Sequence, residues 1–421
     1  MIRSGAKTPF VAIACGGTGG HLFPGLAVAG ELKKRGCRTA LLISPKEIDR
    51  QAVQGAGDIE IFTLPAVGLQ NRNYFSFAGS FVKSLFAARK IFRQCRPDAV
   101  LAMGGFTSAP PVLAAKGLGA KAFLHESNTI PGRANRFLAR FVDEAFVGFP
   151  ETVARLKIRK IATTGTPVRP QFSAGQDSVE AKCRQCRASL GLEPEQPTIL
   201  VMGGSQGASG INEIILSALP CLSGHGQPVR EPRSDVEHAD RLSALQFLHL
   251  TGTNDFERVR AGYAASGIEA VVKPFLAEMD LALGAATVAV SRSGASSLAE
   301  IAAMRLPSLL IPFPAAADNH QYHNARAFET TGAARRLEQK NVTPEGIASI
   351  LRELVADGAA RAAMQTALAR WHAPRAAEDI AENILNACWS SSFSLPQDNR
   401  LKSELHPPRS TDSRQEHVCA A

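Results

Sequence analysis

The chain has 421 residues, of which 45% are hydrophobic and 20% charged, a composition typical of a soluble globular protein with two or three domains. Its net charge of +9 favours anionic partners, but it does not decide between a nucleotide, a nucleic acid and an anionic membrane surface. No stretch reaches the roughly 18 apolar residues of a membrane span, and the apolar run at 10–15 is too short for the core of a signal peptide. We therefore expect a cytoplasmic protein.

The first half of the chain alternates signals for buried strands with signals for helices. The apolar run at 10–15 predicts a strand, and the segment 22–35, which follows a glycine turn, predicts a helix. Further strands are predicted within the stretches 39–44, 98–119, 120–128, 144–149 and 161–168. This alternation predicts a parallel sheet with helices on both faces, in a first domain that spans residues 8–170.

The second half repeats this architecture. A polar segment at 171–196 predicts a linker and an entry helix, after which a second domain is predicted over 197–373. Its strands are predicted within 198–219, 245–252, 269–275, 286–304 and 306–314. We expect a helix at 374–389 to pack back on the first domain, the polar insert at 222–242 to form a surface loop, and the tail at 390–421 to be disordered.

Four glycine-rich turns follow predicted strands, at 16–20, 104–105, 203–207 and 292–297. In parallel sheets such turns lie at the carboxyl ends of strands, where ligands bind, so two tandem domains predict a cleft lined by all four. A dinucleotide fingerprint is not supported, because Leu22 stands at the third glycine position and the second strand ends in "LLISPK" without an acid. A P-loop is not supported, because no Lys-Ser or Lys-Thr pair follows these turns.

The two later turns leave alternatives open. "GGSQG" satisfies G-x-S-x-G, so Ser205 is a candidate hydrolase nucleophile with an Asp and His320 or His323 as triad partners, although the same turn also suits a phosphate. In "SRSGASSLAE", residues 294–297 predict a helix N-terminus that suits a diphosphate, and Glu300 could accept hydrogen bonds from a ribose. Taken alone, an ordinary capped helix is the simpler explanation of this stretch.

Together, these stretches resemble one family. "GGTGGHLFPGLAVA", "GGFTSAPPVLAA", "HESNTIPGRANR", "GTPVR", "GGSQGA", "SRSGASSLAE" and "HQYHNA" occur in this order, and the set is similar to the motifs of the MurG family. The resemblance covers roughly residues 10–375. It implies an α/β fold of the GT-B type, with two Rossmann-like parallel-sheet domains facing a cleft. It also implies inverting transfer of N-acetylglucosamine from UDP-N-acetylglucosamine to the muramyl 4-hydroxyl of an undecaprenyl-pyrophosphoryl-linked muramyl-pentapeptide, a step of peptidoglycan synthesis.

The resemblance also implies where the donor binds. The diphosphate is expected at Ala295, Ser296 and Ser297, with Leu298 and Ala299 continuing the turn and Arg169 and Ser205 beside it. Glu300 is expected to hold the ribose, the Leu276 backbone the uracil, and Asn128 and Gln321 the sugar, with Thr18, Gly19 and Gly20 at the sugar end of the cleft.

This chain departs from the commoner family pattern at three positions. "HESN" stands for HEQN, "GTPVR" stands for GNPVR, and His320 stands where many members carry a second Gln. These changes bear on the sugar-hydroxyl contacts and leave the expected phosphate and ribose contacts intact. The nearest alternative of the same fold is a UDP-N-acetylglucosamine 2-epimerase, which needs no lipid acceptor.

The proposed chemistry needs a base for the incoming hydroxyl and stabilisation of the departing UDP. His21 is the candidate base, because an imidazole titrates near neutrality and this one follows a cleft-facing turn; a purely structural role for His21 is the alternative. His125 and Glu126 are weaker candidates. No D-x-D sequence occurs, and Cys183 and Cys186 form a lone C-x-x-C, so we expect neither a metal nor a cofactor. Backbone amides, Ser205 and Arg169 would stabilise the leaving charge.

The acceptor implied by the resemblance is a membrane lipid that carries a second diphosphate. We expect this diphosphate at Gly16, Gly17, Gly104 and Gly105 in the first domain. The segment 69–96 combines aromatic with basic side chains and predicts an interfacial surface, although a core helix with a solvated basic face is the alternative. Together with this segment, the resemblance implies a peripheral protein on the cytoplasmic face of the inner membrane, with an anionic lipid surface and a cell-wall synthesis complex as partners and no nucleic acid.

Overall fold

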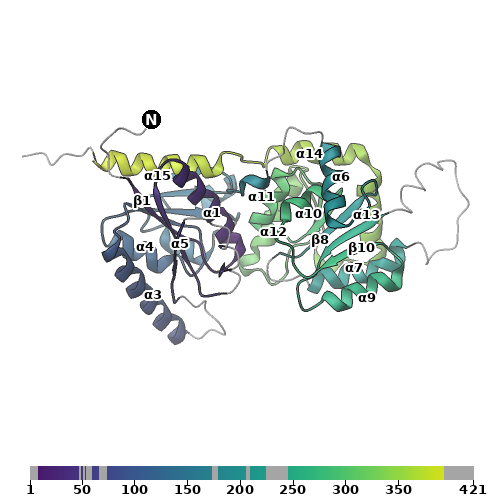
Figure 1. Ribbon diagram of the computed structural model, residues 1–421, viewed down its shortest axis with the longest axis horizontal. Coiled ribbons are helices and arrows are strands. Elements are labelled where there is room, and N and C mark those ends of the chain that lie inside the picture. Colours follow the sequence, from purple (N-terminus) through teal and green to yellow (C-terminus); the bar gives the residue numbers. More distant parts are fainter. Residues whose placement is uncertain are drawn as a thin grey trace, which may run out of the picture.

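The computed structural model describes residues 8–46, 49–50, 53, 59–65, 74–172, 179–204, 209–223 and 245–392. Three features predicted from the sequence lie wholly or largely outside these residues: Ser205, the insert at 222–242 and the tail at 390–421. The described chain forms two lobes side by side, each built around a sheet (Figure 1).

The first lobe contains a seven-stranded parallel sheet with the order β3-β2-β1-β4-β5-β6-β7. Its strands are β1 Phe10–Ala14, β2 Arg38–Ile43, β3 Glu60–Thr63, β4 Ala99–Ala102, β5 Lys121–Glu126, β6 Glu144–Val147 and β7 Ile161–Thr163. The strands predicted from the sequence are confirmed, and β3 is an addition. This edge strand was missed because its residues are only partly buried, so it carries no apolar run.

The second lobe contains a six-stranded parallel sheet with the order β10-β9-β8-β11-β12-β13. Its strands are β8 Thr198–Met202, β9 Gln246–Leu250, β10 Ala270–Lys273, β11 Val288–Ser291, β12 Ser308–Leu310 and β13 Arg335–Arg336. The central strands β8 and β11 are buried throughout, which is why their sequences are apolar. The edge strand β13 consists of two arginines and gives no strand signal.

Helices cover both faces of the two sheets. In the first lobe these are α1 Gly19–Lys34, α3 Tyr74–Gln94, α4 Ala109–Lys116 and α5 Arg133–Leu138, with 3-10 turns η1 Pro150–Arg155 and η2 Pro170–Phe172. The second lobe has α6 Val179–Leu190, α7 Ser209–Leu222, α9 Phe256–Ser266, α10 Met279–Ala285, α11 Ala295–Ala303, α12 His320–Thr330, α13 Pro344–Ala356 and α14 Gly358–Ala369, with η3 Ala317–Asn319 and η4 Gln339–Asn341. Two hydrophobic clusters flank the first sheet, and a larger one fills the second lobe.

The last helix, α15 Ala376–Ser392, returns to the first lobe, as predicted. Figure 1 shows it lying along β1 and α1, and its Ile380, Ile384 and Leu385 join the same buried cluster as Leu22. Just before this helix, the Trp371 ring stacks on Phe328 at 4.5 Å between centroids and lies 5.3 Å from Phe149 of the first lobe. Aromatic packing of Trp371 on Phe328 and Phe149 thus stabilises the segment of the chain that crosses between the lobes.

Each sheet reverses its strand order at one point, between β1 and β4 in the first lobe and between β8 and β11 in the second. Such switch points leave a crevice at the carboxyl ends of the strands, where ligands of α/β proteins bind. The four glycine-rich turns predicted from the sequence follow these four strands. The topology therefore places the turns at 16–20, 104–105 and 292–297 at switch points, together with Gly203 and Gly204, the described part of the turn at 203–207.

Candidate active site

The glycine turns of the two lobes meet. Ser296, in the first turn of α11, donates a hydrogen bond of 2.8 Å to the Gly20 carbonyl at the start of α1. Helices α1 and α11 lie beside each other where the two lobes meet (Figure 1). Two predicted donor-site residues that are 276 positions apart in the sequence are thus brought into contact.

His21 is held against the 104–105 turn. A Cβ atom on Gly104 would lie 2.9 Å from the His21 Nε2 atom, and one on Gly105 would lie 3.1 Å from its Nδ1 atom. Both glycines have positive φ, +105° and +79°, so the backbone conformation and the available space both require glycine here. The His21 Nδ1 atom also lies 3.2 Å from the Thr18 hydroxyl. The structure therefore requires glycine at positions 104 and 105 because a side chain there would collide with the imidazole ring of His21.

The surroundings of His21 keep its ring neutral. Burial lowers the pKa of His21 to about 4; the Asp49 carboxylate opposes this shift, and His320 from the other lobe adds to it. At neutral pH the ring can therefore accept a proton, but it is a weaker base than an exposed histidine. His320 donates its own Nδ1–H to the Ala317 carbonyl at 2.7 Å.

Asp49 was missed in the sequence. Its Oδ2 atom accepts hydrogen bonds from the Gly17 amide at 2.7 Å, the Ser44 amide at 3.1 Å and the Ser44 hydroxyl at 2.5 Å. The tip of the second strand carries no acid, as the sequence indicates, but an acid from further along the chain returns to this strand end. Asp49 lies six positions beyond the end of β2 at Ile43, and the chain returns its carboxylate to the first turn. It bonds the protein's own amide rather than a ribose.

His125 and Glu126 are occupied by structural hydrogen bonds. The His125 Nε2–H donates to the Gly165 carbonyl at 3.0 Å, its Nδ1 lies 3.2 Å from the Ser127 hydroxyl, and burial lowers its pKa to about 4. Glu126 accepts from the Asn128 amide, the Asn128 side chain, the Gly132 amide and the Asn135 side chain at 2.8–3.1 Å. Burial raises the Glu126 pKa against these bonds. Both residues hold the 126–132 loop, which leaves His21 as the stronger base candidate.

Arg169 and Glu300 form a pair across the lobes. The Arg169 Nη2 atom lies 3.7 Å from Glu300 Oε1, and its guanidinium stacks over Phe23 at 4.2 Å and Phe172 at 4.9 Å. Burial raises the pKa of Glu300 to about 7, although Arg169 opposes the shift. The residue predicted to hold the ribose, Glu300, and the residue predicted to contact the diphosphate, Arg169, thus lie next to each other.

The turn before α11 is open to an anion. Its N-cap residue, Gly294, has no side chain to cap the helix, and among the described residues no side chain hydrogen-bonds to the amides of Ala295, Ser296 or Ser297. Gln321 lies beside this turn and accepts hydrogen bonds at its Oε1 from the Ser293 amide at 3.3 Å and the Phe313 amide at 3.0 Å. The protein residues predicted to bind the diphosphate and Gln321, which is predicted to bind the sugar, are therefore adjacent.

Two of the other residues predicted to contact the sugar nucleotide, Leu276 and Leu298, can offer it only their backbone atoms. Leu276 and Leu298 are buried in the hydrophobic cluster of the second lobe, so only their main-chain atoms can face the cleft. Ala299 is half-buried in α11. Ser205 lies outside the described residues.

Arg292 is a second residue that sequence reasoning missed, although it stands within "SRSGASSLAE". Its buried guanidinium donates to the carbonyls of Ile311 and Pro312 and to the Gln339 side chain. A Cβ on Gly210 in α7 would lie 2.9 Å from its Nη2 atom. Burial lowers its pKa to about 10, so it stays charged at neutral pH and supplies a fixed positive charge behind the glycine turns of the second lobe.

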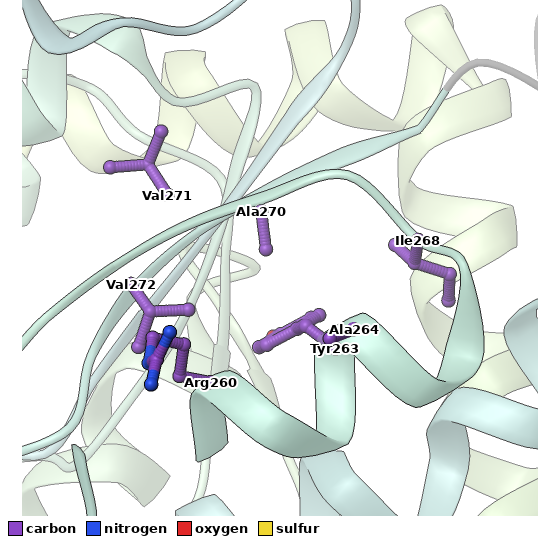
Figure 2. A pocket seen from close by; sticks show the side chains of 7 residues that line it. All are labelled: Arg260, Tyr263, Ala264, Ile268, Ala270, Val271 and Val272. Carbon is purple, nitrogen blue, oxygen red and sulfur yellow. The ribbon is translucent and has the colours of Figure 1, made fainter. Parts of the chain in front are cut away.

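A surface hollow of about 440 Å³ lies elsewhere, between α9 and the edge strand β10 (Figure 2). It is lined by Arg260, Tyr263, Ala264, Ile268, Ala270, Val271 and Val272. None of the predicted site residues lines it. Within the described ranges, no group of three His, Cys, Asp or Glu side chains is arranged to hold a metal ion.

Helix α3 displays apolar side chains at the surface of the first lobe. Phe75 is 93% exposed and Phe86 is 66% exposed, with Lys83, Arg89 and Arg93 exposed along the same helix. Phe77, Phe81 and Leu85 are half-buried, so the helix combines the two predicted alternatives, a packed face and an exposed apolar face. Arg72 and the Tyr74 side chain lie outside the described parts. Among the helices described, none has the length and apolarity to cross a membrane.

Two family models match the chain: the glycosyltransferase family 28 N-terminal domain over residues 11–147 and the glycosyltransferase family 28 C-terminal domain over residues 198–384. A protein of Anaeromyxobacter sp. (strain Fw109-5) is 36% identical, with 90% of this chain and 94% of the relative aligned. It is named UDP-N-acetylglucosamine--N-acetylmuramyl-(pentapeptide) pyrophosphoryl-undecaprenol N-acetylglucosamine transferase, as is a relative from Citrifermentans bemidjiense that is 36% identical over 82% of this chain and 90% of its own.

The chain belongs to the MurG family of glycosyltransferases. The crystal structure of Acinetobacter baumannii MurG superposes with a TM-score of 0.64 at 25% identity, covering 90% of this chain and all of that one. The GT-B fold and an N-acetylglucosaminyltransferase activity, both implied by the resemblance, are confirmed. A UDP-GlcNAc 2-epimerase from Neisseria meningitidis shares the fold, with a TM-score of 0.63 at 14% identity over 90% of this chain and all of that one, but the MurG relatives do not favour the epimerase alternative.

Proposed function

We propose that this chain transfers N-acetylglucosamine from UDP-N-acetylglucosamine, with inversion, to the muramyl 4-hydroxyl of an undecaprenyl-pyrophosphoryl-linked muramyl-pentapeptide. The observation that carries the proposal is the near full-length similarity, at 36% identity, to a relative whose name states this reaction. The meeting of the 16–20 and 292–297 turns supports it, because donor and acceptor must approach each other between the lobes.

One assay tests this function. The protein is incubated with UDP-N-acetylglucosamine, with and without the lipid-linked muramyl acceptor, and UDP release is followed. Release that requires the acceptor is the expected result. Isomerisation of the donor sugar without an acceptor would instead support the epimerase, and labelling of Ser205 by a fluorophosphonate would support the hydrolase.

On the donor side, the diphosphate binds at the amides of Ala295, Ser296 and Ser297. Ser205, which lies outside the described residues, is proposed as a further contact from its motif alone. The ribose hydroxyls donate to Glu300, which has the Arg169 guanidinium as its charged neighbour, 3.7 Å from its Oε1 atom. Arg169 contributes a positive charge beside the diphosphate and offsets the charge that develops on the departing UDP. The uracil meets the Leu276 backbone, and the sugar meets Asn128, Gln321 and the Thr18–Gly20 segment.

His21 removes the proton of the attacking hydroxyl. The base is neutral before the reaction, because its pKa is about 4, and proton transfer accompanies bond formation at the anomeric carbon. The bond to the sugar forms as the bond to the UDP oxygen breaks, and the proton passes to His21. The geometry supports this role because His21 is the one of the three base candidates that protein hydrogen bonds do not fully occupy.

The acceptor diphosphate binds on the first lobe, at Gly16, Gly17, Gly104 and Gly105. Lys46 brings a cation to this turn, since its Nζ atom donates to the Gly17 carbonyl at 3.0 Å. The Gly17 amide already donates to Asp49, so an anion here would be held by the charge of Lys46 and by the first amides of α1, which the side chain of the N-cap residue Thr18 does not cap.

The apolar and basic surface of α3 attaches the protein peripherally to the cytoplasmic face of the inner membrane, where the lipid acceptor lies. The exposed rings of Phe75 and Phe86 support this role. Changing both to Ser should weaken binding to anionic vesicles about fivefold or more in a flotation assay. Val153, an exposed apolar residue on η1, is the matched control, and equal losses in the two variants would contradict the assignment.

A further inference from the structure

A buried asparagine links the two lobes at the candidate active site. Asn324 lies in α12 of the second lobe and has no exposed surface. Its Oδ1 atom accepts hydrogen bonds from the Thr129 amide and the Thr129 hydroxyl, both at 3.0 Å, in the first lobe. Its Nδ2 atom donates to the Ser293 carbonyl at 3.1 Å and to Asn128 Oδ1 at 3.0 Å. No motif-based assignment had given this residue a role.

The chemistry of these partners fixes which way the Asn324 amide faces. The Thr129 backbone N–H can only donate, so it must meet the amide oxygen. The Ser293 carbonyl can only accept, so it must meet the amide nitrogen. A flipped amide would place two donors together and two acceptors together in a buried site, which is costly. Asn324 therefore has one orientation.

This orientation is passed on to Asn128. The second Nδ2 hydrogen of Asn324 requires an acceptor, so Asn128 must turn its oxygen towards Asn324. On its other side, the Asn128 Nδ2 donates at 3.1 Å to Glu126 Oε1, which is itself held by the Asn128 amide. An amide oxygen accepts two hydrogen bonds and an amide nitrogen donates two. Asn128 thus keeps one acceptor position and one donor position, in fixed places, for a ligand.

The same network reaches the diphosphate turn. Ser293, whose carbonyl accepts from Asn324, donates its amide and its hydroxyl to Gln321. Gln321 and Asn128 are the two side chains assigned to the donor sugar. Asn324 is therefore hydrogen-bonded directly to Asn128 and is linked to Gln321 through Ser293.

We propose that Asn324 is a specificity-determining positioning residue, which sets the face that Asn128 presents to the sugar of the nucleotide donor. The inference rests on the proposed function, because it needs a sugar nucleotide between the lobes. Asn324 does not touch the ligand. It acts by fixing the Asn128 amide, and it does so only while the lobes are together, because three of its four hydrogen bonds cross to Thr129 and Asn128 of the first lobe.

Comparing UDP with UDP-N-acetylglucosamine isolates this role. Both ligands use the uracil, ribose and diphosphate contacts, and only the second carries the sugar that meets Asn128. Asn324→Ala should weaken the binding of UDP-N-acetylglucosamine about tenfold in titration calorimetry, the value of one well-oriented hydrogen bond, and that of UDP less than about threefold. A merely structural role would weaken both ligands alike.

A double-mutant cycle tests whether Asn324 acts through Asn128. Asn128→Ala should show the same sugar-dependent loss by itself. Adding Asn324→Ala to it should then weaken UDP-N-acetylglucosamine by less than about twofold more, because the residue that Asn324 orients is already missing. Losses that multiply in the double variant would overturn the proposal.

Two further variants keep the test decisive. Asn324→Asp retains the oxygen that accepts from Thr129 and removes both amide hydrogens, so it should show the same sugar-selective loss where the alanine variant does not fold. Gln246→Ala is the matched control, because Gln246 is a buried amide with several hydrogen bonds at the amino end of β9, away from the cleft. This control should lower the melting temperature without changing the ratio of the two affinities.

Failure of the inference and failure of the proposed function give different results. If Asn324→Ala and Asn324→Asp weaken UDP and UDP-N-acetylglucosamine equally, the positioning role is refuted while the unaltered protein remains an active transferase. If the proposed function is wrong, the unaltered protein itself shows no binding of UDP-N-acetylglucosamine and no acceptor-dependent release of UDP.

Discussion

The two glycine turns that face each other across the lobes look alike in sequence and differ in what surrounds them. At the 16–20 turn, the Gly17 amide is bonded to a buried carboxylate of the protein itself, Asp49. At the 292–297 turn, the residue that opens the turn is Arg292, whose guanidinium is buried and donates to the Ile311 carbonyl. The helices that follow the two turns are alike in that neither N-cap residue provides a side-chain cap. The first turn has an internal negative charge and the second an internal positive charge.

The difference shows that glycine content alone does not identify a phosphate site. In the first lobe, glycine is required because protein groups approach closely: a Cβ on Gly16 would lie 2.7 Å from the Ile43 Cα atom, and Gly104 and Gly105 make room for His21. The first amides of α1 and of α11 both lack a cap from the N-cap side chain, so capping does not distinguish the two turns either. The charges that flank a turn decide whether it favours an anion.

The largest expected effect is at His21. His21→Ala should lower kcat at least 10²-fold if the imidazole is the base. His21→Phe provides the sharper comparison, because it keeps a planar ring against Gly104 and Gly105 but has no nitrogen. Steady-state UDP release measures both variants. If the phenylalanine variant retains near-normal turnover, the ring fills space and is not the base.

Asp49→Asn should have the next largest effect, about tenfold on kcat. The Asp49 charge raises the His21 pKa towards its usual value, so removing it should lower that pKa below about 4 and move the acidic limb of the kcat profile to lower pH. Binding of UDP-N-acetylglucosamine should not change. Asp143→Asn is the control, since Asp143 also bonds a strand amide but at the amino end of β5. If the acidic limb of the kcat profile does not move in Asp49→Asn, then Asp49 does not influence the pKa of the catalytic base.

The second turn should show its own pH dependence through Glu300. Burial holds its pKa at about 7, so Glu300 is mostly protonated below that pH, and an ionised carboxylate accepts from both ribose hydroxyls more strongly than a protonated carboxyl does. Affinity for UDP-N-acetylglucosamine should therefore rise up to about tenfold from pH 6 to pH 8. The ligand's diphosphate is doubly esterified and does not titrate in this range. In calorimetry, Glu300→Gln should bind more weakly and with a flat profile; a slope that persists in this variant would exclude Glu300 as its source.

The smallest effect is expected at Lys46, which offsets the acid of the first turn. Lys46→Met should raise the acceptor KM about fivefold and leave the donor KM unchanged, because one partly exposed charge–phosphate contact is lost. Lys34→Met, at the far end of α1, is the control. Equal changes in both KM values would place the acceptor diphosphate elsewhere.

Much of the fold could be predicted from the sequence, as could a set of candidate site residues. Strands buried on both faces of a parallel sheet must be apolar, so runs such as Thr198–Met202 were visible, whereas β3 and β13 carry polar or partly exposed residues and were not. Matching the ordered motifs to one family then indicated His21, Glu300 and Gln321. Asp49, Arg292 and Asn324 were missed, because no local pattern distinguishes them from ordinary polar residues.

The sequence by itself thus determined the two sheets, the positions of the glycine turns and the class of reaction, since local apolar runs, glycines and their order are written along the chain. Only the tertiary structure decided what each turn accommodates. Asn324 meets Thr129 over a separation of 195 residues, and Asp49 reaches Gly17 from beyond the end of the next strand. Such contacts depend on how whole lobes and strands pack. The charge at each turn and the orientation of the Asn128 amide are therefore both set only when the chain has folded.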